Sequence, residues 1–304
     1  MTTLNEMPPN RAILLANVTC PYCGSELNAD RPGEKEHVIG RRFVPKGILA
    51  GQWNLIVQAC RRCNGDKANL ENDLSIISMH PNAWGELAVD DPRLRAEVER
   101  KAARAISRRT GKPVAHGEAQ LEIKGQWGPA SIGFKFDMPP QAAEERIFEL
   151  ARMQVAAFFY WITFDTPSSK GGFMPGDFAP LNETRKPDWG NPQSLWFMQT
   201  TASWDWRIHA IGADGFFKLA MKKKSETEHI WSWALEWNHN LRVCGFFGDP
   251  TLIDELAQGI PTLEMTTAQR SPKRILRYRR EVALEASDDT MFTLPHAVGA
   301  ELTR

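Results

Sequence analysis

Apolar and polar positions divide the chain into three stretches of different texture. Residues 1–88 hold short apolar runs separated by turns, with few long periodic segments. Residues 89–118 contain one helical pattern, which begins at Asp91-Pro92 as expected of an N-cap followed by proline, and ends by Gly111. Because arginine and lysine fill most of its polar positions, we expect a basic helical linker there.

Residues 119–304 combine helical and strand-like patterns. A helix is predicted over 141–162, and its last turns are apolar all round, which indicates burial. The stretch 165–193 is rich in Gly, Pro, Asp and Asn and is interpreted as a long loop. Period-two alternation predicts strands that form an antiparallel meander. The expected strands are 204–210, 216–221, 231–237 and 241–247, and a basic helix is expected over 272–286.

Composition narrows the class of protein. A chain of 304 residues favours two domains, and 37 basic against 37 acidic residues give no overall basic field. Any contact with nucleic acid must therefore come from local patches. The N-terminus lacks the pattern of a secretory signal, and the longest apolar run is too short to span a bilayer. We expect a cytoplasmic protein with no membrane partner and with reduced thiols.

Two C-x-x-C pairs are the most informative motif. Cys20, Cys23, Cys60 and Cys63 can supply four thiolates, which is the ligand set of a closed structural zinc site. The 36 residues between Cys23 and Cys60 exceed the usual zinc-ribbon spacing of about 15–20. The zinc site should therefore staple a module that carries an insertion between its two halves.

The insertion and its flanks hold residues suited to phosphodiester hydrolysis. His37 suits a general base near neutral pH. Glu36 and the amide oxygen of Asn64 suit a hard cation such as Mg²⁺ or Mn²⁺. Asn54 is either a site residue or an ordinary turn residue. Basic residues that could hold phosphates lie close in sequence: Arg41, Arg42, Arg61, Arg62 and Lys67.

In these motifs the chain resembles the HNH (ββα-metal) endonuclease family over residues 15–80. The matching residues are Cys20-x-x-Cys23, Glu36-His37-Val38-Ile39, Asn54-Leu55 and Cys60-x-x-Cys63-Asn64, with Lys67 three residues on. The resemblance implies two strands and a helix around one divalent cation, with His37 as general base. It also implies that Glu36 and Asn64 bind the cation and that Asn54 orients the loop of His37.

The expected architecture is therefore α+β. A zinc-stapled HNH module (1–88) and a basic helical linker (89–118) precede an α+β recognition or regulatory domain with an antiparallel sheet (119–304). The expected activity is cleavage of DNA, with RNA as a further candidate, in a bacterial defence or mobile-element setting. The C-terminal domain would bind a regulatory partner or a second copy. The alternative is a non-catalytic, zinc-stapled nucleic-acid-binding or adaptor protein.

Overall fold

A computed structural model describes residues 4–6, 11–82, 85–104, 119–127, 130–138, 143–271 and 274–294. Its N-terminal part holds a three-stranded sheet of order β2-β4-β3, made of β2 (Ile13–Leu14), β3 (Gly33–His37) and β4 (Leu55–Cys60). β3 and β4 are antiparallel, and helix α1 (Arg61–Met79) begins directly after β4. The second half of the cysteine motif thus lies on this strand–strand–helix unit, and the first half precedes it in the chain.

The basic linker begins as a helix at the position expected. Helix α2 spans Pro92–Arg104, and the carboxylate of Asp91 accepts a hydrogen bond of 2.7 Å from the backbone N–H of Arg93. Leu94 is buried, which anchors the apolar stripe of the helix against the rest of the protein. The part of the predicted helix beyond residue 104, up to Gly111, lies outside the described residues.

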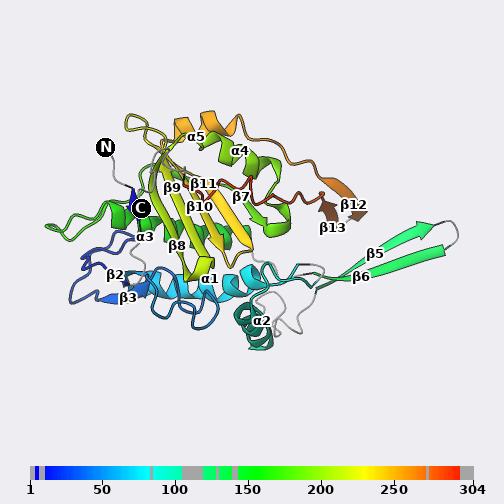
Figure 1. The fold of residues 1–304 in the computed structure, drawn as a ribbon, viewed down its shortest axis with the longest axis horizontal. Helices are drawn as coiled ribbons and strands as arrows, with labels where there is room; N and C mark the ends of the chain where they lie inside the picture. Colours follow the sequence, from blue (N-terminus) through cyan, green and yellow to red (C-terminus); the bar gives the residue numbers. More distant parts are fainter. Residues whose placement is uncertain are drawn as a thin grey trace, which may run out of the picture.

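A six-stranded sheet of order β1-β8-β9-β10-β11-β7 forms the centre of the C-terminal part (Figure 1). Its antiparallel strands β8 (Asp205–Gly212), β9 (Phe217–Lys223), β10 (Ile230–Trp237) and β11 (Leu241–Gly248) confirm the predicted meander. The short β1 (Asn5–Glu6) joins the sheet beside β8, in parallel.

The prediction of one long loop over 165–193 is wrong. Strand β7 (Asp177–Arg185) pairs with β11 along the edge of the sheet, and the short helix η2 (Lys186–Asp188) follows it. β7 contains Pro180, and the register shifts opposite it between Cys244 and Gly245. Proline is tolerated in an edge strand at such an irregularity. The strand is thus set by a partner far along the chain, which its own sequence, interrupted by a proline, does not indicate.

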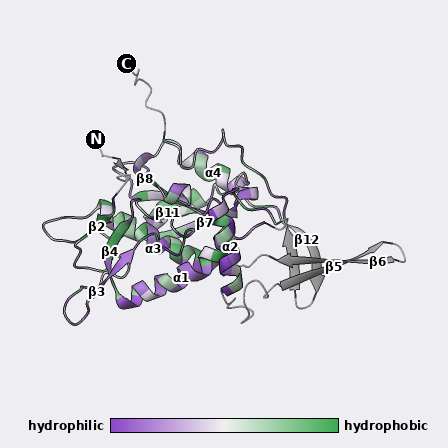
Figure 2. Cartoon of the chain, turned by 60° about the horizontal axis from the view of Figure 1, so that its bottom comes forward, coloured by the Kyte–Doolittle hydropathy of each residue, from purple (hydrophilic) through white to green (hydrophobic). Residues whose placement is uncertain are grey.

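Helices cover both faces of this sheet. Helix α3 (Glu144–Ile162) packs beneath it, between the sheet and α1, and its burial confirms the predicted helix. Helices α4 (Pro192–Thr200) and α5 (Pro250–Ala257) cover the opposite face, where Phe197 and Ile253 pack with Phe246. Figure 2 shows hydrophilic and hydrophobic residues alternating along α1.

Two hairpins complete the described elements. β5 (Ala119–Trp127) pairs with β6 (Ala130–Met138), and β12 (Thr266–Ser271) pairs with β13 (Arg274–Tyr278). The second hairpin shows that the basic helix predicted over 272–286 is wrong, and the short helix η3 (Ala213–Gly215) was not predicted. Arg274–Tyr278 is short enough to suit either state, and its pairing with the preceding strand selects the extended one.

The N-terminal unit and the C-terminal sheet share one hydrophobic core. The same cluster holds Phe43 and Leu74 from the N-terminal part and Phe158 and Trp237 from the C-terminal part. The indole of Trp53 donates a hydrogen bond of 3.1 Å to the carbonyl of Ile211. No helix among the described residues is long and apolar enough to cross a membrane.

Candidate functional site

The four motif cysteines converge at one place. Their sulfur atoms all lie within 4.8 Å of one another, and the sulfurs of Cys23 and Cys60 are 3.8 Å apart. Four thiolates about 2.3 Å from a tetrahedral zinc ion would be about 3.8 Å apart, so the cluster fits zinc. Of the described residues, only this group forms a cluster of His, Cys, Asp or Glu ligands suited to a metal.

Local structure explains how each cysteine pair brings its two sulfurs together. Cys60 is the last residue of β4, and Cys63 lies in the first turn of α1. Cys20 and Cys23 lie in a tight turn closed by a hydrogen bond of 2.9 Å from the backbone N–H of Gly24 to the carbonyl of Cys20. Gly24 has φ of +73°, a backbone conformation that glycine adopts without strain.

His37 is the last residue of β3, opposite Ile56 of β4. It is half-buried, and burial lowers the pKa of its imidazole below the ordinary value, with the positive charge of Arg41 acting in the same direction. The neutral imidazole is the form that accepts a proton, so the surroundings of His37 suit a base near neutral pH.

Asn54 holds the backbone that follows His37. Its side-chain oxygen accepts a hydrogen bond of 3.2 Å from the N–H of Ile39, and its side-chain nitrogen donates one of 2.8 Å to the carbonyl of Ile39. Asn54 is itself buried just before β4. The amide therefore links the segment after β3 to the start of β4.

Lys67 lies in the interior, not on the phosphate-accessible surface expected for it. Its side chain is 0% exposed, and its ammonium is 2.6 Å from a carboxylate oxygen of Glu36 and 2.5 Å from one of Glu71. The same ammonium donates a hydrogen bond of 3.2 Å to the carbonyl of His37. This placement does not favour a contact between Lys67 and phosphate.

Lys67, Glu36 and Glu71 form a buried ion cluster, in which Glu71 is the member that the sequence did not suggest. It also accepts a hydrogen bond of 3.1 Å from the N–H of Gly40, and burial raises the pKa of its carboxyl group. The signal that could have found it is its position four residues after Lys67 on a helix, where the two side chains are neighbours.

Glu36 and Asn64 have different protein partners. Glu36 pairs with Lys67, whereas the side-chain N–H of Asn64 donates a hydrogen bond of 2.8 Å to the carboxylate of Glu34. The ammonium of Lys67 faces one carboxylate oxygen of Glu36, and Asn64 bonds to Glu34 through its N–H. A divalent cation would therefore have to use the second oxygen of Glu36 and the amide oxygen of Asn64.

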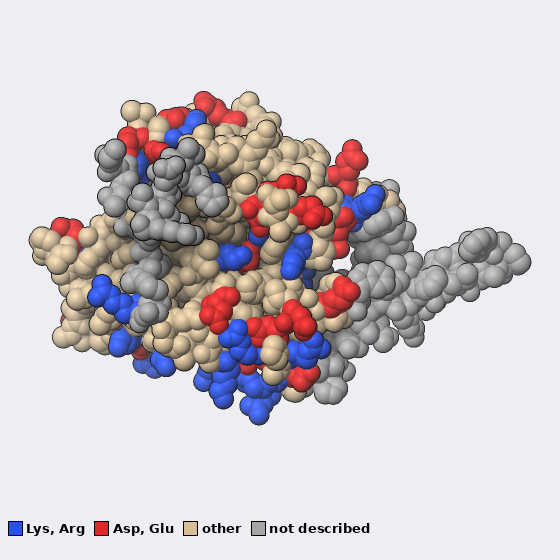
Figure 3. Space-filling view, in the orientation of Figure 1, with Lys and Arg blue, Asp and Glu red and all other residues tan. Residues whose placement is uncertain are grey.

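A basic cleft of about 1050 Å³ lies beside this unit, between α1, α2 and the segment after His37. Its lining includes six basic side chains and two acidic ones, Asp73 and Glu97. Figure 3 shows Lys and Arg gathered at the lower edge of the molecule, where α2 lies. Lys101 is buried and donates a hydrogen bond of 2.6 Å to the carbonyl of Arg42, which ties α2 to one wall. The basic residues of the lining are Arg41, Arg42, Lys46, Arg100, Lys101 and Arg104.

The expected phosphate-binding residues thus fall into three groups. Arg41 and Arg42 line the cleft, and Lys67 is buried. Arg61 and Arg62 are exposed in the first turn of α1, where Arg62 lies 3.7 Å from Asp66. The sequence placed Arg100 and Arg104 on a basic helix and left Lys46 unassigned. Only the packing of α2 against α1 brings them together with Arg41 and Arg42.

Comparisons with protein-family models, with curated proteins and with solved structures found no match for this chain.

Proposed function

We propose that this protein is a metal-dependent endonuclease of the HNH type that hydrolyses phosphodiester bonds in DNA. The observation that carries the proposal is the position of His37. A half-buried imidazole with a lowered pKa ends β3, the strand whose first residue pairs with Cys60 of the Cys₄ cluster, and the basic cleft begins four residues further along the chain at Arg41. A base beside a phosphate-binding surface is the minimum that hydrolysis of a phosphodiester requires.

In the proposed reaction, neutral His37 takes a proton from a water molecule as its oxygen attacks phosphorus. The bond from phosphorus to the leaving oxygen breaks, and that oxygen takes up a proton and becomes a 3′-hydroxyl. Arg41 and Arg42 would bind the charged phosphates, because a guanidinium can donate two parallel hydrogen bonds to them. A bound divalent cation would neutralise charge that develops on the leaving oxygen.

Asn54 and the cysteine cluster would act by positioning. Asn54 bonds both backbone groups of Ile39, so it limits the motion of the segment that leads away from His37. The zinc would join the turn at Cys20 to the start of α1. In this scheme the C-terminal sheet, which shares the core of the N-terminal unit, serves recognition or regulation.

The test compares His37→Ala with His229→Ala, a matched change at an exposed histidine. Supercoiled plasmid, single-stranded DNA and RNA are incubated with each protein over a range of Mg²⁺ and Mn²⁺ concentrations. We expect His37→Ala to lower the cleavage rate about 10²- to 10⁴-fold, the range for removal of a general base. Its zinc content and melting temperature should stay near the wild-type values. Cleavage by His37→Ala at the wild-type rate would remove His37 from the reaction.

A second candidate is a zinc-stapled protein that binds nucleic acid without cutting it. The observation that favours it is the ion pair between Lys67 and Glu36, which gives Glu36 a protein cation in place of a metal ion. Under this hypothesis wild-type protein binds DNA with steep salt dependence and cuts no substrate at any metal concentration. Binding would weaken on Arg41→Ala and Arg42→Ala but not on His37→Ala.

A further inference from the structure

A second cavity, of about 560 Å³, lies far in sequence from the cysteine motif. Its walls come from Asn82 and residues 86–89 after α1, from η2 and Trp189, from the ends of β9, β10 and β11, and from residues in the stretch 283–289. A volume of this order suits a small organic ligand. None of the residues expected from the sequence to bind or react lies in this cavity.

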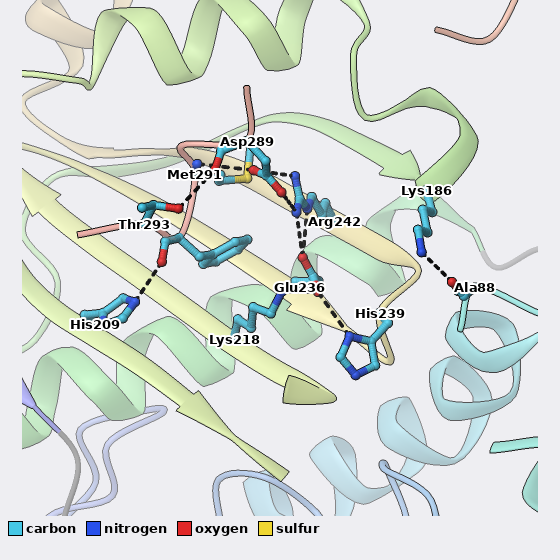
Figure 4. Close-up of polar contacts among 11 residues, drawn as sticks. Ala88, Lys186, His209, Lys218, Glu236, His239, Arg242, Asp289, Met291 and Thr293 are labelled. Carbon is cyan, nitrogen blue, oxygen red and sulfur yellow. Dashed lines mark hydrogen bonds and ion pairs between the residues drawn. The ribbon is translucent and has the colours of Figure 1, made fainter. Parts of the chain in front are cut away.

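A row of alternating charges forms one wall of the cavity. Register places Glu236 of β10 opposite Lys218 of β9 and opposite Arg242 of β11. Lys218 lies 2.8 Å from one oxygen of Glu236, and Arg242 donates hydrogen bonds of 2.8 and 2.9 Å to the other. Arg242 also pairs with Asp289 (Figure 4). The guanidinium of Arg242 lies over the ring of Trp189, 3.4 Å from its centre.

The acidic side chains of the lining already have partners. Glu236 is bound by Lys218 and Arg242, and Asp289 is bound by Arg242. Glu86 accepts a hydrogen bond of 2.9 Å from the side chain of Asn82. Glu236 and Asp289 are therefore neutralised by basic side chains, whereas Glu86 bonds to a neutral amide and is exposed to solvent, which screens its charge.

Several N–H groups that line the cavity can still donate hydrogen bonds to a ligand. Trp189 is only 8% exposed, and its buried indole N–H has no hydrogen-bond partner among the described residues. Lys186 is exposed, and its ammonium donates to the carbonyl of Ala88 (Figure 4). An ammonium carries three donors, so Lys186 and Lys218 can each bind a further acceptor.

The rest of the lining supplies an apolar surface. Leu87, Val89, Pro187 and Leu284 line the cavity together with the ring of Trp189. We propose that this cavity binds a small organic anion, with its acidic group at Lys186 and a flat apolar body against Trp189 and its neighbours. The site is independent of the chemistry proposed at His37.

The test uses anilinonaphthalene sulfonate, a flat aromatic anion whose fluorescence rises on binding, and its neutral counterpart phenylnaphthylamine. Full-length wild-type protein should bind the anion at one site and bind the neutral probe at least about tenfold more weakly. Lys186→Met should weaken binding of the anion about tenfold, which corresponds to about 1.4 kcal/mol. Lys186→Arg keeps the positive charge and should bind the anion like wild type. Binding of the neutral probe should not respond to either change.

Two further variants separate the site from a general effect. Lys224→Met removes an exposed lysine that pairs with Glu228 outside this cavity, and it should bind the anion like wild type. Trp189→Phe keeps a ring but removes the unpartnered N–H, and it should weaken binding about threefold at an unchanged fold by circular dichroism. Equal binding of the anion by wild type, Lys186→Met and Trp189→Phe would overturn the proposal. Equal affinity for the two probes would overturn it as well.

Discussion

Two buried ion clusters in this protein have opposite arrangements of charge. Around Lys67, one ammonium that is 0% exposed lies between two carboxylates, Glu36 and Glu71. Around Glu236, one carboxylate that is 0% exposed lies between two cations, Lys218 and Arg242. Buried charges persist only when they are paired and hydrogen-bonded. The first cluster pairs a central cation with anions, and the second pairs a central anion with cations.

The difference shows what each cluster can accept. The Lys67 cluster has an excess of negative charge, so a cation that replaced or joined Lys67 would be stabilised there. In the cavity beside Glu236 the carboxylates have partners while lysine and indole donors remain. The first arrangement therefore favours positive charge beside Glu36 and Glu71, and the second favours an anion at the C-terminal sheet.

The largest loss of stability should come from the cysteine cluster, which holds the start of α1, the helix that carries Lys67. Cys60→Ser should lose the zinc and unfold the N-terminal unit, because apparent zinc-binding energies of about 10–16 kcal/mol are coupled to folding at such sites. Metal analysis and thermal unfolding would measure both. Cys244→Ser, a change at a buried cysteine outside the cluster, should keep the zinc. Full zinc content in Cys60→Ser would separate that cysteine from the metal.

The next effect compares one lysine from each cluster. Lys67→Met leaves two buried carboxylates without their cation and should lower the free energy of unfolding by about 3–5 kcal/mol. Lys218→Met should cost about 1 kcal/mol, because Lys218 is 23% exposed and Glu236 keeps Arg242. Urea unfolding of both variants makes the measurement. Equal losses would mean that the two clusters do not differ in the way described.

A smaller effect concerns Lys222, which shares β9 with Lys218. Burial lowers the pKa of Lys222 to about 8, and its ammonium donates a hydrogen bond of 3.1 Å to the carbonyl of Thr201. A lysine with a lowered pKa binds fewer protons in the folded than in the unfolded state between that pKa and its ordinary value, so stability rises with pH there.

Lys222→Met should therefore be more stable than wild type at pH 7 by about 2 kcal/mol. The gain should shrink as pH rises from 8 to about 10, where the unfolded lysine also loses its proton. Unfolding curves at several pH values measure the difference, and Lys224→Met provides the exposed control. A constant difference across this range would mean that Lys222 does not titrate as described.

The smallest effect is expected at Asn54. Asn54→Ala removes two hydrogen bonds to the backbone of Ile39 and should cost about 1–2 kcal/mol of stability. Asn54→Asp keeps the acceptor for the N–H of Ile39 but loses the donor to its carbonyl. If Asn54 positions His37, Asn54→Ala should lower cleavage more than its small loss of stability explains. Wild-type cleavage by Asn54→Ala would leave it a structural residue only.

Local patterns explain the successful predictions of the fold. The alternation in Trp231–Trp237 marks a strand with one face on α3, and the all-apolar end of α3 marks a helix covered on every side. β7 escaped prediction because Pro180 and the polar run 182–185 form a strand only through pairing with β11. The extended state of 274–278 likewise depends on pairing with β12.

The sequence by itself determined the two cysteine pairs, because C-x-x-C spacing on a turn or at a helix start places two sulfurs together by local geometry, whereas the tertiary fold brings the two pairs to one cluster. It also indicated His37 and Asn54 as residues of one segment. Only the tertiary structure decided that Lys67 is an internal cation, that α2 completes a basic cleft, and that Lys218, Glu236 and Arg242 form one row. Strand register and helix packing join residues far apart in the chain, and no local pattern of side chains encodes those partners.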